Sequence, residues 1–277
     1  MTSGDLSLLG ARRLRELLDE HGVRPHKELG QNFVIDPNTI RKVVEVARLE
    51  GTERVLEIGA GAGSLTLGLA AAAAHVTAVE FDRRLIGVLE ETLGSLDNVE
   101  VAHADALDLG WEGIEADSVV ANLPYNIATP LVVTMLERAP QIRTLTVMTQ
   151  REVGERLAAR PPGKAYGQVS VLVQYFGRAS IAARISRNAF WPVPRVDSVL
   201  VGIERRAQPP PVDYDVLARL VKAGFSQRRK TLRNALADLD PRDRRVEELL
   251  DRSGIPPATR AETVTLEKWI ELAREWR

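Results

Sequence analysis

The chain contains no cysteine, and this absence sets the first limit on its chemistry. Without thiols there is no disulfide framework and no thiolate nucleophile, which fits a reducing compartment. The four histidines are scattered and show no metal-ligand spacing, so we predict no metal site. No segment reaches the roughly 18 apolar residues of a membrane span. The first twenty residues alternate charges with leucines, which predicts a short amphipathic helix instead of a secretory signal. We expect a soluble, cytoplasmic protein with no membrane partner.

A strong net charge is also missing, since 37 Lys and Arg stand against 38 Asp and Glu. The distribution is less even, because nine basic and only three acidic residues lie between positions 219 and 245. A locally basic segment on a near-neutral chain indicates contact with a polyanion. A solvated helix face would carry the same charges, so charge alone leaves both interpretations open.

Strand-like apolar segments alternate with helical patterns, which is typical of an α/β fold with a parallel sheet covered by helices. We predict strands at residues 54–58, 75–80, 99–102, 118–121 and 144–148 and helices at 65–74, 85–93 and 130–137. Two more strands are predicted at 169–175 and 198–203. No convincing helix separates these two, which indicates an antiparallel edge on the sheet.

The clearest domain boundary is the stretch "RRAQPPPVD" at 205–213. Three consecutive prolines cannot continue a helix, and they stiffen an extended linker. Beyond them the pattern is helical throughout, and Thr265 is a suitable N-cap for a last helix at 266–275. We predict a sheet domain with an N-terminal helical extension at 1–206, a linker at 207–212 and a small helical domain at 213–277.

A glycine-rich loop, "EIGAGAGSLT" at 57–66, follows the first predicted strand. Gly59, Gly61 and Gly63 allow a tight turn and a close approach of the backbone to a ligand. Ser64 occupies the place of the third glycine of a dinucleotide fingerprint, which disfavours a nicotinamide cofactor. The loop by itself is weak support for any nucleotide-like ligand.

Two acids strengthen that interpretation, because Glu80 and Asp105 end the second and third predicted strands. Either acid alone could be a helix cap or a solvated loop residue. Together they lie at the sheet edge where open α/β folds bind ligands. Glu80 can accept hydrogen bonds from ribose hydroxyls, and Asp105 can bond an adenine amino group. The pattern indicates an adenosine-containing cofactor without a pyrophosphate, which S-adenosylmethionine fits best.

The fourth predicted strand ends in Asn122-Leu123-Pro124-Tyr125, with no acid, base or nucleophile beside it. In isolation this is a simple strand-ending turn. Behind a cofactor loop it offers hydrogen-bond acceptors, namely the Asn122 side-chain oxygen and the backbone carbonyl near Leu123. Acceptors can activate an exocyclic amine of a base and stabilise the charge that develops on methylation. Pro124 fixes that carbonyl, and Tyr125 supplies a stacking face.

Taken together, these motifs resemble the small-subunit (16S) ribosomal RNA adenine N6,N6-dimethyltransferases, the KsgA/RsmA family, over nearly the whole chain. The resemblance includes "KELGQNFVID" at 27–36, "VEFD" at 79–82, "NLPYNIATP" at 122–130 and "FWPVPRVDSVL" at 190–200. It extends to "FSQRRKTLRNAL" at 225–236, which is specific to this family among methyltransferases. It implies a Rossmann-like methyltransferase sheet followed by a helical domain that binds RNA and the ribosome.

The resemblance also implies roles for individual residues. Cofactor-binding positions are Gln31, Asn32, Val34, Gly59, Gly61, Glu80, Asp105, Ala106 and Asn122. Catalytic positions are Asn122, Leu123, Pro124 and Tyr125. The target adenine would stack between Tyr125 and Phe190, and phosphates would bind Arg228, Arg229, Lys230 and Arg233.

The implied substrate is two adjacent adenosines in the 3′-terminal hairpin loop of 16S rRNA in the pre-30S particle. Each adenosine receives two methyl groups, and the enzyme has a further role in subunit assembly. We expect a monomer. Three alternatives stay open, namely an Erm-type enzyme acting on large-subunit rRNA, a non-catalytic assembly or transcription factor on the same fold, and a nicotinamide oxidoreductase.

Overall fold

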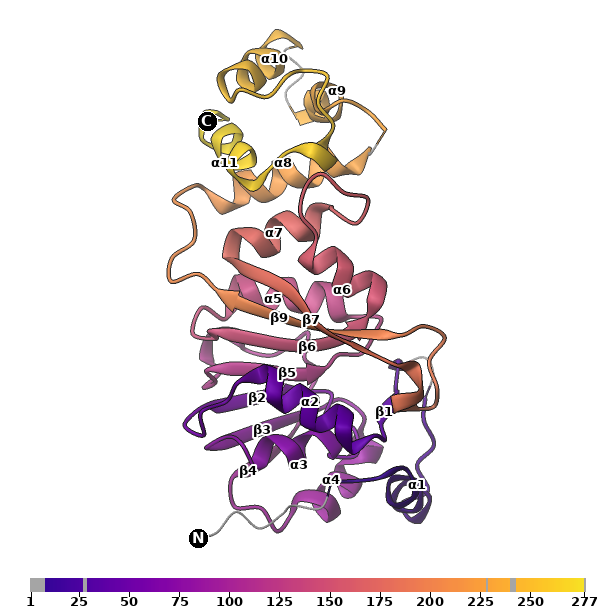
Figure 1. The fold of residues 1–277 in the computed structure, drawn as a ribbon. Helices are drawn as coiled ribbons and strands as arrows, with labels where there is room; N and C mark the ends of the chain where they lie inside the picture. The colour runs from indigo at the N-terminus through magenta and orange to yellow at the C-terminus, as the bar shows by residue number, and fades with distance from the viewer. Residues whose placement is uncertain (1–7, 27–28, 228, 240–242, 277) are drawn as a thin grey trace. The chain divides into compact units, whose positions relative to one another are not determined.

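The computed structural model describes residues 8–26, 29–227, 229–239 and 243–276. Its main feature is a seven-stranded sheet with the order β4-β3-β2-β5-β6-β9-β7 (Figure 1). The strands are β2 (Arg54–Ile58), β3 (His75–Glu80), β4 (Val99–His103), β5 (Ser118–Asn122), β6 (Thr144–Gln150), β7 (Gly177–Ile185) and β9 (Ser198–Arg205). Strands β2 to β6 are parallel to one another, and β9 runs antiparallel to β6. The five parallel strands and the antiparallel strand at 198–203 are therefore confirmed.

One predicted strand is wrong, because residues 169–175 form the helix α7 (Gln168–Phe176). This segment is a short apolar run rich in valine, and such a run does not distinguish a strand from a buried helix. The strand of this region is β7, which follows directly and lies at the end of the sheet. Most of its side chains are exposed, so it lacks the apolar alternation that marks a half-buried strand.

Helices cover the sheet as the alternating pattern predicts. They are α1 (Ala11–Glu20), α2 (Pro37–Ala47), α3 (Ser64–Ala70), α4 (Ile86–Leu93), α5 (Ala128–Arg138) and α6 (Arg151–Ala158). Short 3-10 turns form η2 (Arg83–Leu85), η3 (Trp111–Gly113) and η4 (Arg187–Ala189). Helices α2 and α3 bury Ile40, Val43, Leu65 and Leu69 in one apolar core with side chains of β2, β3, β5, β6 and β9. A two-stranded sheet of β1 (Phe33–Val34) and β8 (Phe190–Trp191) lies outside the main sheet.

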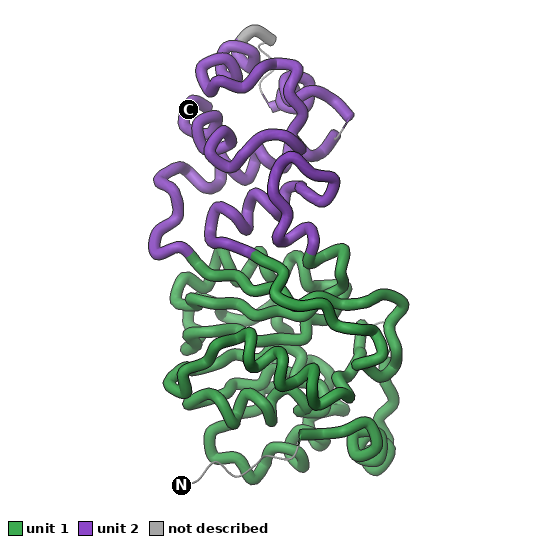
Figure 2. Tube along the Cα trace, viewed as in Figure 1, with its two compact units in different colours: residues 1–154, 180–205 green, residues 155–179, 206–277 purple. Residues whose placement is uncertain are grey.

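The chain divides into two compact units (Figure 2). Unit 1 comprises residues 1–154 and 180–205, and unit 2 comprises 155–179 and 206–277. Unit 2 contains α7, α8 (Tyr214–Ser226), α9 (Leu232–Leu236), α10 (Asp243–Arg252), α11 (Leu266–Glu275) and the 3-10 turns η5 (Ala237–Leu239) and η6 (Ala261–Thr263). The Thr265 hydroxyl accepts from the Lys268 amide at 3.4 Å, which confirms the predicted cap of α11.

The units differ from the predicted domains in one segment, residues 155–179. Tyr166, Val171 and Tyr175 of this segment share a buried apolar core with Leu217 and Trp269 of the C-terminal helices. Burial of that shared surface holds the segment in unit 2, although it precedes the proline-rich linker by about thirty residues. Within the described part of the chain, no helix is both long and apolar enough to cross a bilayer.

Candidate active site

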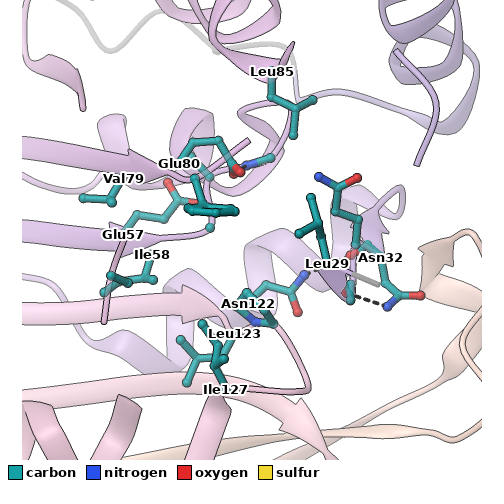
Figure 3. Close-up of a pocket in the computed structure, with 18 of the residues that line it drawn as sticks. Leu29, Asn32, Glu57, Ile58, Val79, Glu80, Leu85, Asn122, Leu123 and Ile127 are labelled. Atoms are coloured by element: carbon teal, nitrogen blue, oxygen red, sulfur yellow. Dashed lines mark hydrogen bonds between the residues drawn. The ribbon is translucent and has the colours of Figure 1, made fainter. Parts of the chain in front are cut away.

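A cavity lies at the carboxyl ends of β2, β3 and β5, next to the segment that leads into β1 (Figure 3). Five separate stretches of sequence contribute to its lining. All nine positions implied for cofactor binding line it, namely Gln31, Asn32, Val34, Gly59, Gly61, Glu80, Asp105, Ala106 and Asn122. Leu123, Pro124 and Tyr125 line the same cavity. The structure therefore brings these side chains together, and their chemical roles remain predictions.

The glycine loop needs its glycines for conformation and for space. Gly59, Gly61 and Gly63 have φ angles of 74°, 63° and 85°, a region that side chains rarely adopt. A Cβ atom at Gly61 would lie 3.0 Å from the Phe33 ring. The loop backbone at Gly61 thus packs directly against the Phe33 ring of β1, with no room for a side chain of its own.

Glu80 is a buried acid held by two backbone amides. Its Oε2 accepts from the Gly61 amide and its Oε1 from the Asp82 amide, both at 2.8 Å. Burial raises the pKa of Glu80, although these hydrogen bonds oppose the shift. Each oxygen keeps a free lone pair, so the carboxyl group can still accept from a hydroxyl of a ligand.

Asp82 has a structural role that the sequence reasoning missed, although its motif "VEFD" was noted. Its carboxylate accepts from Arg84 at 2.6 and 2.9 Å and from the Gln31 amide nitrogen at 2.8 Å. The bond from Arg84 is the main reason why the pKa of Asp82 falls to about 2. Gln31 also accepts from the His26 amide at 2.8 Å. Gln31 therefore connects the N-terminal segment to the end of β3 by hydrogen bonds.

Asn122 has one half of its amide group paired and the other half free. Its Nδ2 donates to the Asn32 carbonyl oxygen at 3.0 Å. Because a carbonyl only accepts, this bond fixes which end of the amide faces Asn32. Its Oδ1 is buried and has no hydrogen-bond partner among the described residues. A buried acceptor without a partner is costly, and because Asn122 lines the cavity, a ligand there could supply the missing donor.

The rest of the loop after β5 holds Tyr125 in place. The Leu123 amide donates to the Met148 carbonyl at 3.0 Å, and the Ile127 amide donates to the Pro124 carbonyl at 3.2 Å. The Tyr125 hydroxyl lies 2.8 Å from the Ser198 hydroxyl oxygen. Burial raises the pKa of Tyr125. The tyrosine is thus a neutral ring that is anchored at its far end and borders the cavity with the rest of its surface.

Glu57 was also missed, because its place just before the glycine loop looked like ordinary strand sequence. Its side chain is only 1% exposed, lines the cavity and has an Oε2 atom without a hydrogen-bond partner in the described structure. Burial raises the pKa of Glu57 to about 8; the nearby Thr66 hydroxyl lowers it and the Glu80 carboxyl raises it. It is therefore a mostly neutral acid at pH 7.

One implied site residue does not reach the cavity. Phe190 is fully buried and pairs with Val34 across the β1–β8 ladder, packed with Ile40, Met148 and Leu200. Its ring is enclosed by these neighbours in this structure, and its stacking on the target adenine opposite Tyr125 stays a prediction. The local motif could not reveal this, since the burial comes from residues far away in sequence.

The remaining implied positions differ in how available they are. Asp105 Oδ1 accepts from the Leu107 amide at 2.8 Å. This hydrogen bond within the loop is the alternative role that the sequence leaves open for Asp105. Arg229 and Lys230 are exposed in unit 2. Arg233 lies 3.5 Å from Glu247 in an ion pair, and Arg228 lies outside the described residues.

The unusual state of Glu57 predicts how stability depends on pH. The folded protein binds a proton here between pH 4.5 and about 8 and the unfolded chain does not, so stability should fall as pH rises through this window. The Glu57→Gln protein should not lose this part of its free energy of unfolding as pH rises, because the amide stays neutral. Urea unfolding of the ligand-free protein at pH 5, 6, 7 and 8 measures the difference. If the free energy of unfolding changes with pH in the same way in both proteins, Glu57 is not the group that binds the proton.

The chain is similar to known proteins over almost its full length. Residues 22–277 match the family model described as ribosomal RNA adenine dimethylase. Ribosomal RNA small subunit methyltransferase A of Leifsonia xyli is 45% identical, over 97% of this chain and 99% of that protein. The protein of the same name from Rhodococcus opacus is 43% identical, over 98% of this chain and 95% of that protein.

Two solved structures have the same fold. A dimethyladenosine transferase from Plasmodium falciparum is 24% identical and superposes with a TM-score of 0.77, covering 87% of this chain and 96% of that one. The 23S rRNA methyltransferase ErmE is 32% identical with a TM-score of 0.69, covering 88% of this chain and 99% of that one. The match over residues 22–277 and the identity to full-length relatives show that the chain belongs to the ribosomal RNA adenine dimethylase family.

Proposed function

We propose that this protein transfers methyl groups from S-adenosylmethionine to the N6 amino groups of two adjacent adenosines in the 3′-terminal hairpin loop of 16S rRNA, giving N6,N6-dimethyladenosines. The observation that carries this proposal is the buried, unpaired Oδ1 atom of Asn122 at the end of β5. Methylation of an exocyclic amine needs a hydrogen-bond acceptor for the amino group, and it needs no general acid or general base. The names of the relatives from Leifsonia xyli and Rhodococcus opacus support the small subunit as the target.

The cavity fits an adenosine-containing cofactor. Glu80 would hold the ribose hydroxyls, and Asp105 and Ala106 would border the adenine. Gly59 and Gly61 would allow close backbone approach, and a side chain at Gly61 would meet the Phe33 ring. When bound, S-adenosylmethionine supplies an electrophilic methyl group. The other partners of the cofactor would come from Gln31, Asn32, Val34 and Asn122, all of which line the cavity.

The loop after β5 would activate the substrate amine by accepting hydrogen bonds from it. An exocyclic amine is a poor nucleophile because its lone pair is delocalised into the ring. Asn122 Oδ1 and the carbonyl before Pro124 would hold the amino hydrogens, which favours a pyramidal nitrogen. They would also stabilise the positive charge that grows there. The product loses its proton to water, so the site needs no general base.

Tyr125 would hold the target ring flat, as aromatic side chains do in single-stranded nucleic-acid sites. Its hydroxyl bond to Ser198 fixes the ring before a base arrives. Loop bases are already partly unstacked, so drawing one into the cavity costs less than flipping it from a duplex. The exposed Arg229 and Lys230 would contact phosphates and help to bind the pre-30S particle. We also propose that the protein is cytoplasmic, acts as a monomer and takes part in assembly of the small subunit.

The particle specificity can be tested with mass spectrometry. We expect incubation of undermethylated 30S particles with protein and labelled S-adenosylmethionine to yield dimethyladenosines in the 3′-terminal fragment of 16S rRNA. Parallel incubation with 50S particles is the comparison, because the 23S rRNA methyltransferase ErmE shares this fold at 32% identity. Label found only in 50S RNA would refute the proposal and favour the large-subunit alternative. Binding to 30S particles without any label would favour the non-catalytic alternative.

The acceptor mechanism can be tested with Asn122→Ala. Loss of one preorganised hydrogen bond to developing charge costs on the order of 10²–10³ in kcat, so we expect at least that loss while binding to 30S particles is retained. Asn38→Ala is a matched control, since it removes an exposed amide on α2 that does not line the cavity, and it should change kcat less than tenfold. Single-turnover methyl transfer measures both. Equal rates for Asn122→Ala and the wild type would rule out the mechanism.

A further inference from the structure

Unpaired polar atoms gather where β2 passes into α3. Glu57 Oε2 and Ser64 Oγ are both buried, and neither has a hydrogen-bond partner in the described structure. The Thr66 hydroxyl faces the Glu57 carboxyl group and lowers its pKa, so Thr66 is not counted with them. Glu57 and Ser64 line the cavity. A buried polar atom without a partner loses its hydration without compensation, and at a cavity wall a bound ligand can supply the missing partner.

The described hydrogen bonds of four glycine-loop amides go to acceptors other than Glu57. The Gly59 and Ala60 amides donate to the Val79 carbonyl at 2.8 and 3.2 Å, and the Gly63 amide donates to the Ala60 carbonyl at 2.9 Å. The Gly61 amide donates to Glu80. These amides are therefore satisfied without the Glu57 carboxyl group, and its buried oxygen is available to something else.

Four acids lie at this sheet edge, and they are compensated differently. Asp105 accepts from the Leu107 amide. Asp82 is paired with Arg84 and Glu80 with two backbone amides. Among the described residues, the groups that act on Glu57 are the neutral Thr66 hydroxyl of α3 and the acidic Glu80 of β3, and neither is a cation. With a pKa of about 8, raised by burial, it carries a proton at neutral pH. A positive charge brought into the cavity would reverse that balance.

We propose that Glu57 holds a proton in the ligand-free protein and releases it to the solvent when a cationic ligand enters the cavity. The inference rests on the proposed function, because the ligand that supplies the charge is the sulfonium- and ammonium-bearing cofactor. The carboxylate that remains lies in the field of that charge, so binding and ionisation stabilise each other. Affinity for the cofactor then rises with pH, by up to about tenfold per unit below the pKa of the free site.

Calorimetry in buffers of different ionisation enthalpy tests the inference on the whole protein. At pH 7 we expect release of about one proton for each S-adenosylmethionine bound, because a group with a pKa of about 8 is mostly protonated there. The uncharged 5′-methylthioadenosine should release none. Glu57→Gln should abolish the release seen with S-adenosylmethionine and flatten the pH dependence of Kd. Glu90→Gln, which changes an exposed acid on α4, should keep both.

Calorimetry on the wild-type protein tests the proton release even if a variant fails to fold. A binding enthalpy for S-adenosylmethionine that is the same in every buffer would overturn the inference. So would unchanged proton release in Glu57→Gln, since another group would then be the source. In both cases the proposed function stands, because the cofactor still binds. Absence of any binding of S-adenosylmethionine would instead refute the proposed function and the inference with it.

Discussion

The hydrogen bond from Asn122 Nδ2 to the Asn32 carbonyl oxygen is the contact on which the rest of the site depends. It joins residues 90 positions apart and fixes the amide so that its oxygen, and not its nitrogen, is left unpaired. The same N-terminal segment packs its Phe33 ring on the glycine loop and ties Gln31 to Asp82. These contacts therefore fix the positions of the glycine loop, the N-terminal segment and the end of β5 relative to one another.

The cavity separates its functions by how each polar group is compensated. Glu80 is locked by amides and suits the neutral hydroxyls of a sugar. Asp82 is neutralised by Arg84 and serves the architecture. Asn122 and Glu57 each keep an unpaired oxygen, at the ends of two neighbouring strands. In the proposed function Asn122 accepts from an amine, and in the proposed further role Glu57 ionises in response to the charge of a ligand.

Local patterns predicted much of this molecule, and long-range packing decided the rest. The parallel strands, the glycine loop and the acid Glu80 at a strand end follow from periodicity and from the geometry of α/β sheets. The helix at 168–176 could not be predicted, because its valine-rich run becomes helical by packing Tyr175 against the C-terminal helices. Burial of Phe190 and the unpaired Glu57 oxygen also depend on neighbours that no local motif names.

The acceptor role of Asn122 is tested most directly by a structure of the protein with S-adenosylhomocysteine and an RNA hairpin that carries the two adenosines. We expect an adenine N6 atom to lie within about 3.2 Å of Asn122 Oδ1, the upper range of N–H···O bonds. The bond from Asn122 Nδ2 to the Asn32 carbonyl should be kept, with the base against Tyr125. An adenine bound with its amino group away from Asn122, or paired with the amide nitrogen, would contradict the account.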